Sequence, residues 1–95
     1  MSRVSFSYGK RHVVAGWDRP LSEYFLTVTG EDEEVEWTSM YSPSSVDRVS
    51  THRLQEVLEF ELEIEAPETF WGIVDRREGN VSYCLEGDKW IKRDW

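Results

Sequence analysis

The feature that most constrains the fold is a strict alternation of apolar and polar residues near the N-terminus. Val4, Phe6 and Tyr8 alternate with one arginine and two serines. A period of two is typical of a strand with one buried face, because successive side chains point to opposite faces of a sheet. Gly9 then supplies the positive φ of a tight type II′ turn, and residues 11–15 read as the returning strand.

A second pair of strands is predicted after a forced corner. Pro20 has no backbone N–H and moves Arg19 away from helical conformation, so a turn or strand edge is expected there. Residues 23–30 are rich in β-forming side chains, residues 30–34 form an acidic loop, and residues 35–41 form the strand that returns. These strands should pair antiparallel.

The stretch after residue 50 sends two signals. Apolar residues fall at helical spacing from Leu54 onward, yet residues 59–65 alternate with a period of two. We predict a helix over residues 51–61 and an extended connector over residues 62–66, although the pattern itself leaves residues 59–65 open between helix and strand.

The remainder of the chain predicts one more helix and a terminal hairpin. A proline at position 67 suits a helix start, and Gly79 suits the residue that follows a helix end. Residues 81–95 contain two apolar segments around a turn. The expected fold is therefore a single α+β domain over residues 1–95: an antiparallel sheet with two consecutive helices packed on one face and a C-terminal β-hairpin.

The charge is concentrated in the middle of the chain. The net charge is −8, and residues 31–65 hold eleven acidic and two basic residues, a net −9. Direct binding to nucleic acid is disfavoured, because lysine and arginine contacts to phosphates supply most of that affinity. A basic protein partner fits better, although a run of charge is also typical of a surface that only keeps a protein soluble.

The sequence predicts a cytoplasmic protein. It contains no apolar run near the roughly 20 residues that a membrane helix needs, and no signal-peptide pattern. Its single cysteine, Cys84, cannot form an internal disulfide, which agrees with a reducing compartment. We expect no contact with a membrane.

The segment from residue 11 to residue 41 resembles a group of short, uncharacterised bacterial proteins. The likeness rests on the run GWDRPL, a Gly-aromatic-Asp-x-Pro-Leu pattern that precedes a strand ending in an acidic hairpin. The resemblance implies a bacterial origin and a small α+β domain. It implies no known activity, so no catalytic role is carried over.

Motifs for catalysis, metals and cofactors are absent from the sequence. The two histidines lie forty residues apart and there is one cysteine, which gives no metal-ligand spacing. No nucleophile elbow or phosphate-binding glycine loop is present. We expect no enzyme, no metal and no cofactor. A small hydrolase is the disfavoured alternative, and it would need His12, Asp18 and Arg19 to face one cleft.

Five tryptophans are the most informative side chains for binding. A domain of 95 residues has room for few fully buried indoles, and exposed ones tend to anchor partners. Trp17 and Trp37 are assigned mainly to the core. Trp71 lies off the apolar stripe of its helix and is assigned to an interface. Trp90 and Trp95 close the chain and are expected to dock on the domain or on a second subunit.

Arg19 in the corner before Pro20 has two interpretations. Its guanidinium could meet an acidic partner or stack on Trp17, or it could form an internal ion pair with Asp18, Glu23 or the acidic loop, and the internal pair is favoured.

The sequence therefore predicts a non-enzymatic, acidic protein that binds another protein through exposed aromatics and carboxylates, with self-association into a homodimer as one form. The narrower alternative is an inhibitor that mimics nucleic acid toward a basic nucleic-acid-binding protein, as phage antagonists of bacterial defence do. The candidate binding residues are Trp17, Asp18, Arg19, Trp71, Trp90 and Trp95.

Overall fold

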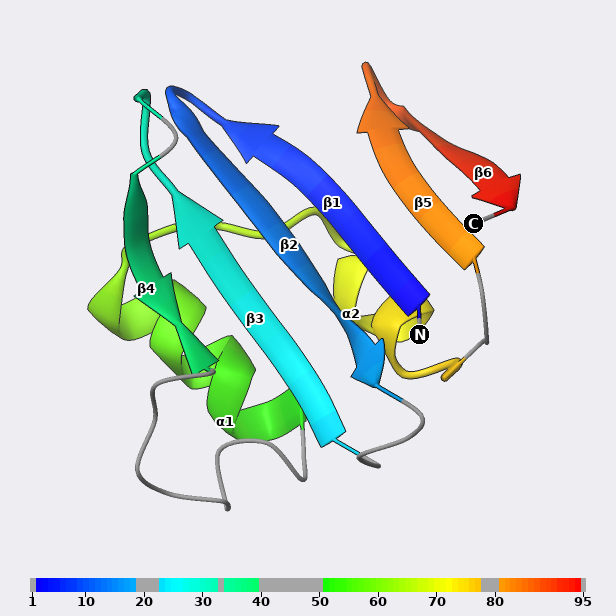
Figure 1. Ribbon diagram of the computed structural model, residues 1–95, viewed down its shortest axis with the longest axis horizontal. Coiled ribbons are helices and arrows are strands. Elements are labelled where there is room, and N and C mark those ends of the chain that lie inside the picture. Colours follow the sequence, from blue (N-terminus) through cyan, green and yellow to red (C-terminus); the bar gives the residue numbers. More distant parts are fainter. Residues whose placement is uncertain (1, 19–22, 33, 40–50, 78–80, 95) are drawn as a thin grey trace.

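A six-stranded sheet forms the centre of the protein. The computed structural model describes residues 2–18, 23–32, 34–39, 51–77 and 81–94. The sheet has the strand order β4-β3-β2-β1-β5-β6 (Figure 1). Its strands are β1 (Ser2–Tyr8), β2 (Arg11–Asp18), β3 (Glu23–Thr29), β4 (Val35–Thr38), β5 (Val81–Glu86) and β6 (Lys89–Asp94).

Helical segments cover one face of this sheet (Figure 1). They are α1 (Thr51–Glu56), the π-helical η3 (Val57–Glu61) that continues it, and α2 (Phe70–Val74). The predicted α+β class is confirmed. Within the described ranges, no helix has the length and apolar content needed to cross a membrane.

The sheet is mixed, so the prediction of an antiparallel sheet is wrong in one pairing. The pairs β1–β2, β2–β3, β3–β4 and β5–β6 are antiparallel, but β1 and β5 are parallel, with Ser2 opposite Val81 and Ser5 opposite Cys84. The reason is the path of the chain: α2 lies against the sheet near the start of β1 (Figure 1). β5, the strand that follows α2, therefore begins beside the start of β1 and runs in the same direction.

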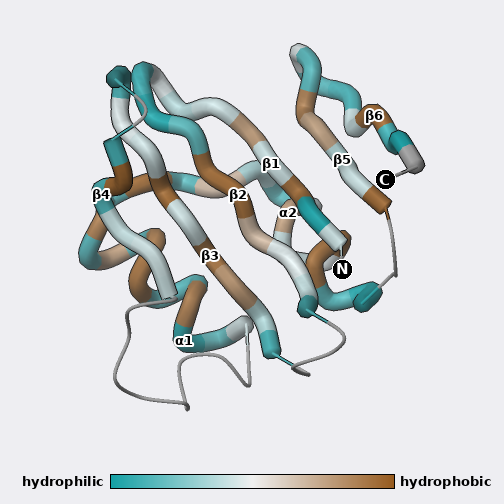
Figure 2. The backbone as a smooth tube through the Cα atoms, viewed as in Figure 1, coloured by the Kyte–Doolittle hydropathy of each residue, from teal (hydrophilic) through white to brown (hydrophobic). Residues whose placement is uncertain are grey.

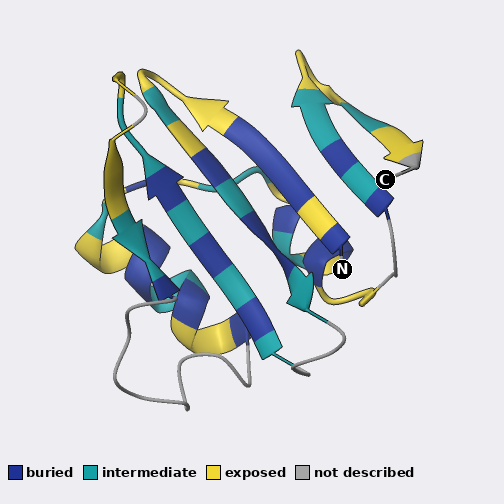
Figure 3. Cartoon of the chain, viewed as in Figure 1, coloured by how far each residue is buried: buried dark blue, intermediate teal, exposed yellow. Residues whose placement is uncertain are grey.

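The alternation in β1, β2 and β3 places their apolar residues on the helix-covered face. Val4, Ala15 and Leu26 are paired across the three strands and are 1%, 0% and 0% exposed. Figure 2 shows the apolar residues along these central strands, and Figure 3 shows buried positions alternating with more exposed ones. The rest of the buried apolar core consists of Phe6, Val13, Tyr24, Val28, Leu54, Val57, Leu58, Ile64, Phe70, Ile73, Val74, Val81 and Tyr83.

The turn between β1 and β2 follows the prediction. Gly9 has a φ of 61°, and Tyr8 pairs with Arg11 across the two-residue turn. Residues with side chains rarely adopt this left-handed conformation, so glycine is favoured there.

The first helical unit spans residues 51–61, as the spacing of its apolar residues predicts, but its last turn is π-helical. The backbone N–H of Leu62 donates to the carbonyl of Val57 at 3.0 Å, and that of Ile64 donates to Leu58 at 2.9 Å. Glu63 ends the unit with a φ of 54°. This wide ending returns Ile64, which is 1% exposed, to the same core as Leu58.

The second helix is shorter than predicted. The second helix is limited to Phe70–Val74. Before it, the backbone N–H of Phe70 donates to the carbonyl of Pro67 in a separate turn. After Val74 the hydrogen bonds tighten to three-residue spacing, and Arg77 adopts a φ of 52°. The chain thus leaves the helix at Arg77, and Gly79, the predicted residue after the helix end, lies outside the described residues.

Phe70 and Phe60 form a matched pair for testing where the core lies. Phe70 is 0% exposed, whereas Phe60 is 72% exposed. We expect Phe70→Ala to lower the free energy of unfolding by about 3–5 kcal/mol, because it opens a cavity in the core. Phe60→Ala should change it by less than about 0.5 kcal/mol. Urea denaturation followed by circular dichroism measures both, and equal losses at the two positions would contradict this core.

Gly16 and Gly72 form a second pair. A Cβ at Gly16 would collide with the carbonyl oxygen of Ser2 and lie 2.8 Å from the Phe25 ring, whereas a Cβ at Gly72 would meet nothing within 4 Å. Gly16→Ala should therefore destabilise the protein by about 1–3 kcal/mol through overpacking. Gly72→Ala should stabilise it by about 0.5–1 kcal/mol, because alanine favours a helix. Thermal unfolding tests the opposite signs.

Candidate functional site

Four of the candidate binding residues from the sequence belong to the described part of the chain. Trp17 and Asp18 lie at the end of β2, Trp71 lies in α2, and Trp90 lies in β6. The predictions for Arg19 and Trp95 fall outside the described residues. The four described tryptophans, Trp17, Trp37, Trp71 and Trp90, are all half-buried at the margin of the core.

Trp17 takes part in an internal cluster. Its ring meets Tyr24 edge to face, with centroids 4.7 Å apart. The guanidinium of Arg77 lies 4.7 Å from the centroid of the Trp17 ring, and the Nε of Arg77 donates to the hydroxyl of Tyr24 at 2.7 Å. Among the described residues, Arg77 therefore supplies a guanidinium that stacks on Trp17. These contacts tie the end of α2 to the sheet.

Trp90 is also engaged within the chain. Its Nε1 donates to the hydroxyl of Thr69 at 2.7 Å, and its ring stacks near Phe70 with centroids 6.1 Å apart. Trp90 thus joins β6 to the start of α2.

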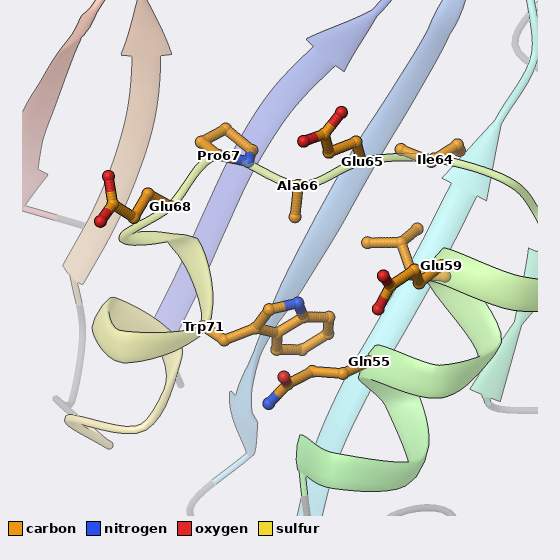
Figure 4. Close-up of a pocket in the computed structure, with 9 residues that line it drawn as sticks. Gln55, Glu59, Ile64, Glu65, Ala66, Pro67, Glu68 and Trp71 are labelled. Atoms are coloured by element: carbon orange, nitrogen blue, oxygen red, sulfur yellow. The ribbon is translucent and has the colours of Figure 1, made fainter.

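Trp71 differs because its indole forms one wall of a groove. The groove lies between the α1–η3 unit, the connector at residues 64–68 and α2, and has a volume of about 190 Å³. In Figure 4 the indole points from α2 toward the opposite helix, with Gln55 on one side and Ala66 on the other. Phe70 holds the indole in place through an edge-to-face contact at 4.9 Å.

The lining of the groove combines apolar walls with an acidic rim. Leu58, Ile64, Ala66 and Pro67 supply the apolar surface, and none of the described residues that line the groove is basic. The acidic rim consists of Glu59, Glu65 and Glu68, shown in Figure 4.

These carboxylates are exposed and free of ion pairs to the described part of the chain. None of the ion pairs found there includes Glu59, Glu65 or Glu68. The acidic loop differs, because Glu31 pairs with Lys10 at 3.5 Å. The negative charge around the groove is therefore available to a ligand.

Phe60 is the residue that the sequence analysis missed. It belongs to η3 and follows Glu59, whose side chain lines the groove. With 72% of its surface exposed, it is the most exposed of the large apolar side chains in the described ranges. The signal was present in the sequence, because in the predicted helix over residues 51–61 Phe60 lies two positions after Leu58 and therefore off the apolar stripe of Leu54 and Leu58.

A second hollow lies at the β1–β2 turn. Its volume is about 460 Å³, and Lys10, Arg11 and His12 contribute to its lining. Lys10 is paired with Glu31, and Arg11 with Glu36 at 3.0 Å, so both cations are already compensated.

Two residues named for the catalytic alternative, His12 and Asp18, are far apart in the structure. His12 and Asp18 lie near opposite ends of β2, about 20 Å apart at the usual rise of a strand. The described residues contain no group of three or more histidine, cysteine or carboxylate side chains that could hold a metal ion.

Comparison of the chain with protein-family models finds no matching family, and comparisons with curated proteins and with solved structures find no significant match either. The geometry and charge of the groove therefore carry the functional argument.

Arg76 and Arg77 test the structural role of the Trp17 cluster. Both are exposed arginines, but Arg77 makes the stacking contact and the hydrogen bond. Arg77→Ala should lower the free energy of unfolding by about 1–2 kcal/mol. Arg76→Ala removes the same charge and should change it by less than about 0.5 kcal/mol. Equal effects in thermal denaturation would show that the cluster contributes nothing specific.

Proposed function

We propose that this protein is a non-enzymatic binding protein whose helical face receives a basic segment of another protein. The observation that carries the proposal is the groove beside Trp71, which combines an aromatic wall with carboxylates that lack ion pairs to the described residues. Aromatic and acidic groups together attract lysine and arginine side chains.

The charge of the helical face supports a basic partner. Residues 54–74 contain six glutamates and no lysine, arginine or histidine. Only Glu56 among these six has an ion pair to a described residue, with His52 at 2.9 Å and Arg53 at 3.3 Å. The remaining five are exposed: Glu59, Glu61, Glu63, Glu65 and Glu68. Such a field raises the rate at which a basic surface associates.

A partner of a different sequence is favoured over self-association through the C-terminus. The indole of Trp90 is already bonded to Thr69 and stacked near Phe70 within the same chain. It therefore offers little new surface to a second copy.

The narrower hypothesis, that the carboxylates replace nucleic-acid phosphates, predicts one additional result. A partner of that kind would be a nucleic-acid-binding protein, and DNA or RNA would compete with this chain for it. Competition by nucleic acid separates the two versions once a partner is bound.

Charge removal on the helical face tests the proposal. The probe is a fluorescent twelve-residue peptide of alternating lysine and leucine, and an equivalent peptide of glutamate and leucine serves as the reference. The wild-type protein should bind the lysine peptide, with affinity falling about tenfold from about 0.05 M to about 0.5 M salt. The triple variant Glu59→Gln, Glu61→Gln, Glu65→Gln should weaken binding about tenfold or more.

The acidic loop supplies the matched control. The triple variant Glu31→Gln, Asp32→Asn, Glu34→Gln removes the same net charge away from the groove. It should weaken binding about threefold at most, through long-range charge alone. Equal weakening by both triples, or binding that is insensitive to salt, would overturn the assignment to the helical face.

A further inference from the structure

We infer that the groove takes one lysine or arginine side chain of the partner against the indole of Trp71, and that Phe60 contacts an apolar residue beside it. The inference rests on the proposed function, because it specifies the contacts through which a basic segment is held. It identifies the partner's recognition segment by chemistry: a cationic residue with an apolar neighbour.

The size of the groove selects a single side chain. Its volume of about 190 Å³ is below the roughly 300–1,000 Å³ that sites for small-molecule ligands and cofactors occupy. One long side chain that enters from a partner's surface fits this space better than a separate ligand.

The order of chemical groups in the groove matches a long cationic side chain. The apolar walls at Leu58, Ile64 and Pro67 suit a chain of methylene groups. The indole of Trp71 and the carboxylates at the rim suit the charged end, through cation–π and ionic contacts. An anionic side chain would meet only repulsion from the rim.

Phe60 extends the contact beyond the groove. It follows Glu59, whose side chain lines the groove, in the same helical turn. Carboxylates at Glu59 and Glu61 flank it, which is the pattern of an apolar anchor within a charged surround.

The local backbone holds this exposed aromatic in position. The π-helical turn and the left-handed conformation of Glu63, with a φ of 54°, let Ile64 return to the core while Phe60 faces outward. A non-glycine residue in that conformation is strained, and strain of this kind concentrates at binding sites.

Indole signals in a ¹⁵N–¹H spectrum test the groove directly. The five tryptophans give separate side-chain signals, and the Trp71→Phe variant assigns the one that belongs to Trp71. Titration with the lysine–leucine peptide should move the Trp71 signal and leave that of Trp37 unchanged. Trp71→Leu should weaken binding about tenfold, and Trp71→Phe should restore most of it, because the aromatic face is retained.

Phe60 is tested with a second peptide that has serine in place of leucine. Phe60→Ser should weaken binding of the lysine–leucine peptide about tenfold and leave that of the lysine–serine peptide unchanged. Because Phe60 is 72% exposed, the variant should fold normally, and an unchanged melting temperature verifies this.

The outcomes separate the inference from the proposed function. Binding to the helical face with an unmoved Trp71 signal would overturn the groove assignment and leave the proposed function standing. Equal effects of Phe60→Ser on both peptides would overturn the role of Phe60. A wild-type protein that binds neither lysine peptide would overturn the proposed function and this inference together.

Discussion

The edge-to-face contact between Phe6 and Phe70, with centroids 4.8 Å apart, joins the sheet to the helical layer. Phe70 is fully buried, and its ring also contacts Trp71 at 4.9 Å and lies near Trp90 at 6.1 Å. The Phe70 side chain therefore contacts β1 through Phe6, the groove through Trp71 and β6 through Trp90. Aromatic contacts of this kind add stability beyond the area that they bury, and they also fix ring orientation. The groove depends on that orientation.

The position of the tryptophans follows from the same packing. The fully buried core between the two layers is filled by phenylalanine and aliphatic residues such as Phe6, Val13 and Leu26. The indoles lie at the margin instead, where a ring can be covered and the polar N–H can reach a partner, as in the bond from Trp90 to Thr69. A half-buried indole is therefore the ordinary outcome in this fold. Trp71 stands apart because its indole faces a groove whose described lining residues include three glutamates and no basic residue.

Local patterns predicted the strands and much of the helical half, while contacts between distant residues decided the rest. The alternation around Phe6 and the turn at Gly9 are local signals, and both were interpreted correctly. The parallel pairing of Ser2 with Val81 depends on the path of the helices across the sheet, which no local pattern encodes. Likewise, Gln55 and Glu68 line the same groove, although they are thirteen residues apart in the sequence and their spacing does not predict that they lie close together.

The end of η3 explains why the conflicting periods in residues 59–65 were informative. A regular strand would have placed Phe60 on the same face as Leu58 and Ile64, and a regular helix would have turned it away from Leu58, because residues two apart in a helix point in nearly opposite directions. The structure instead ends the helix with a π turn and places the strain at Glu63, so that Leu58 and Ile64 share the core while Phe60 remains outside it. This ending lies in the part of the sequence where negative charge is most concentrated, and it carries the exposed aromatic side chain through which we propose that the protein contacts a basic partner.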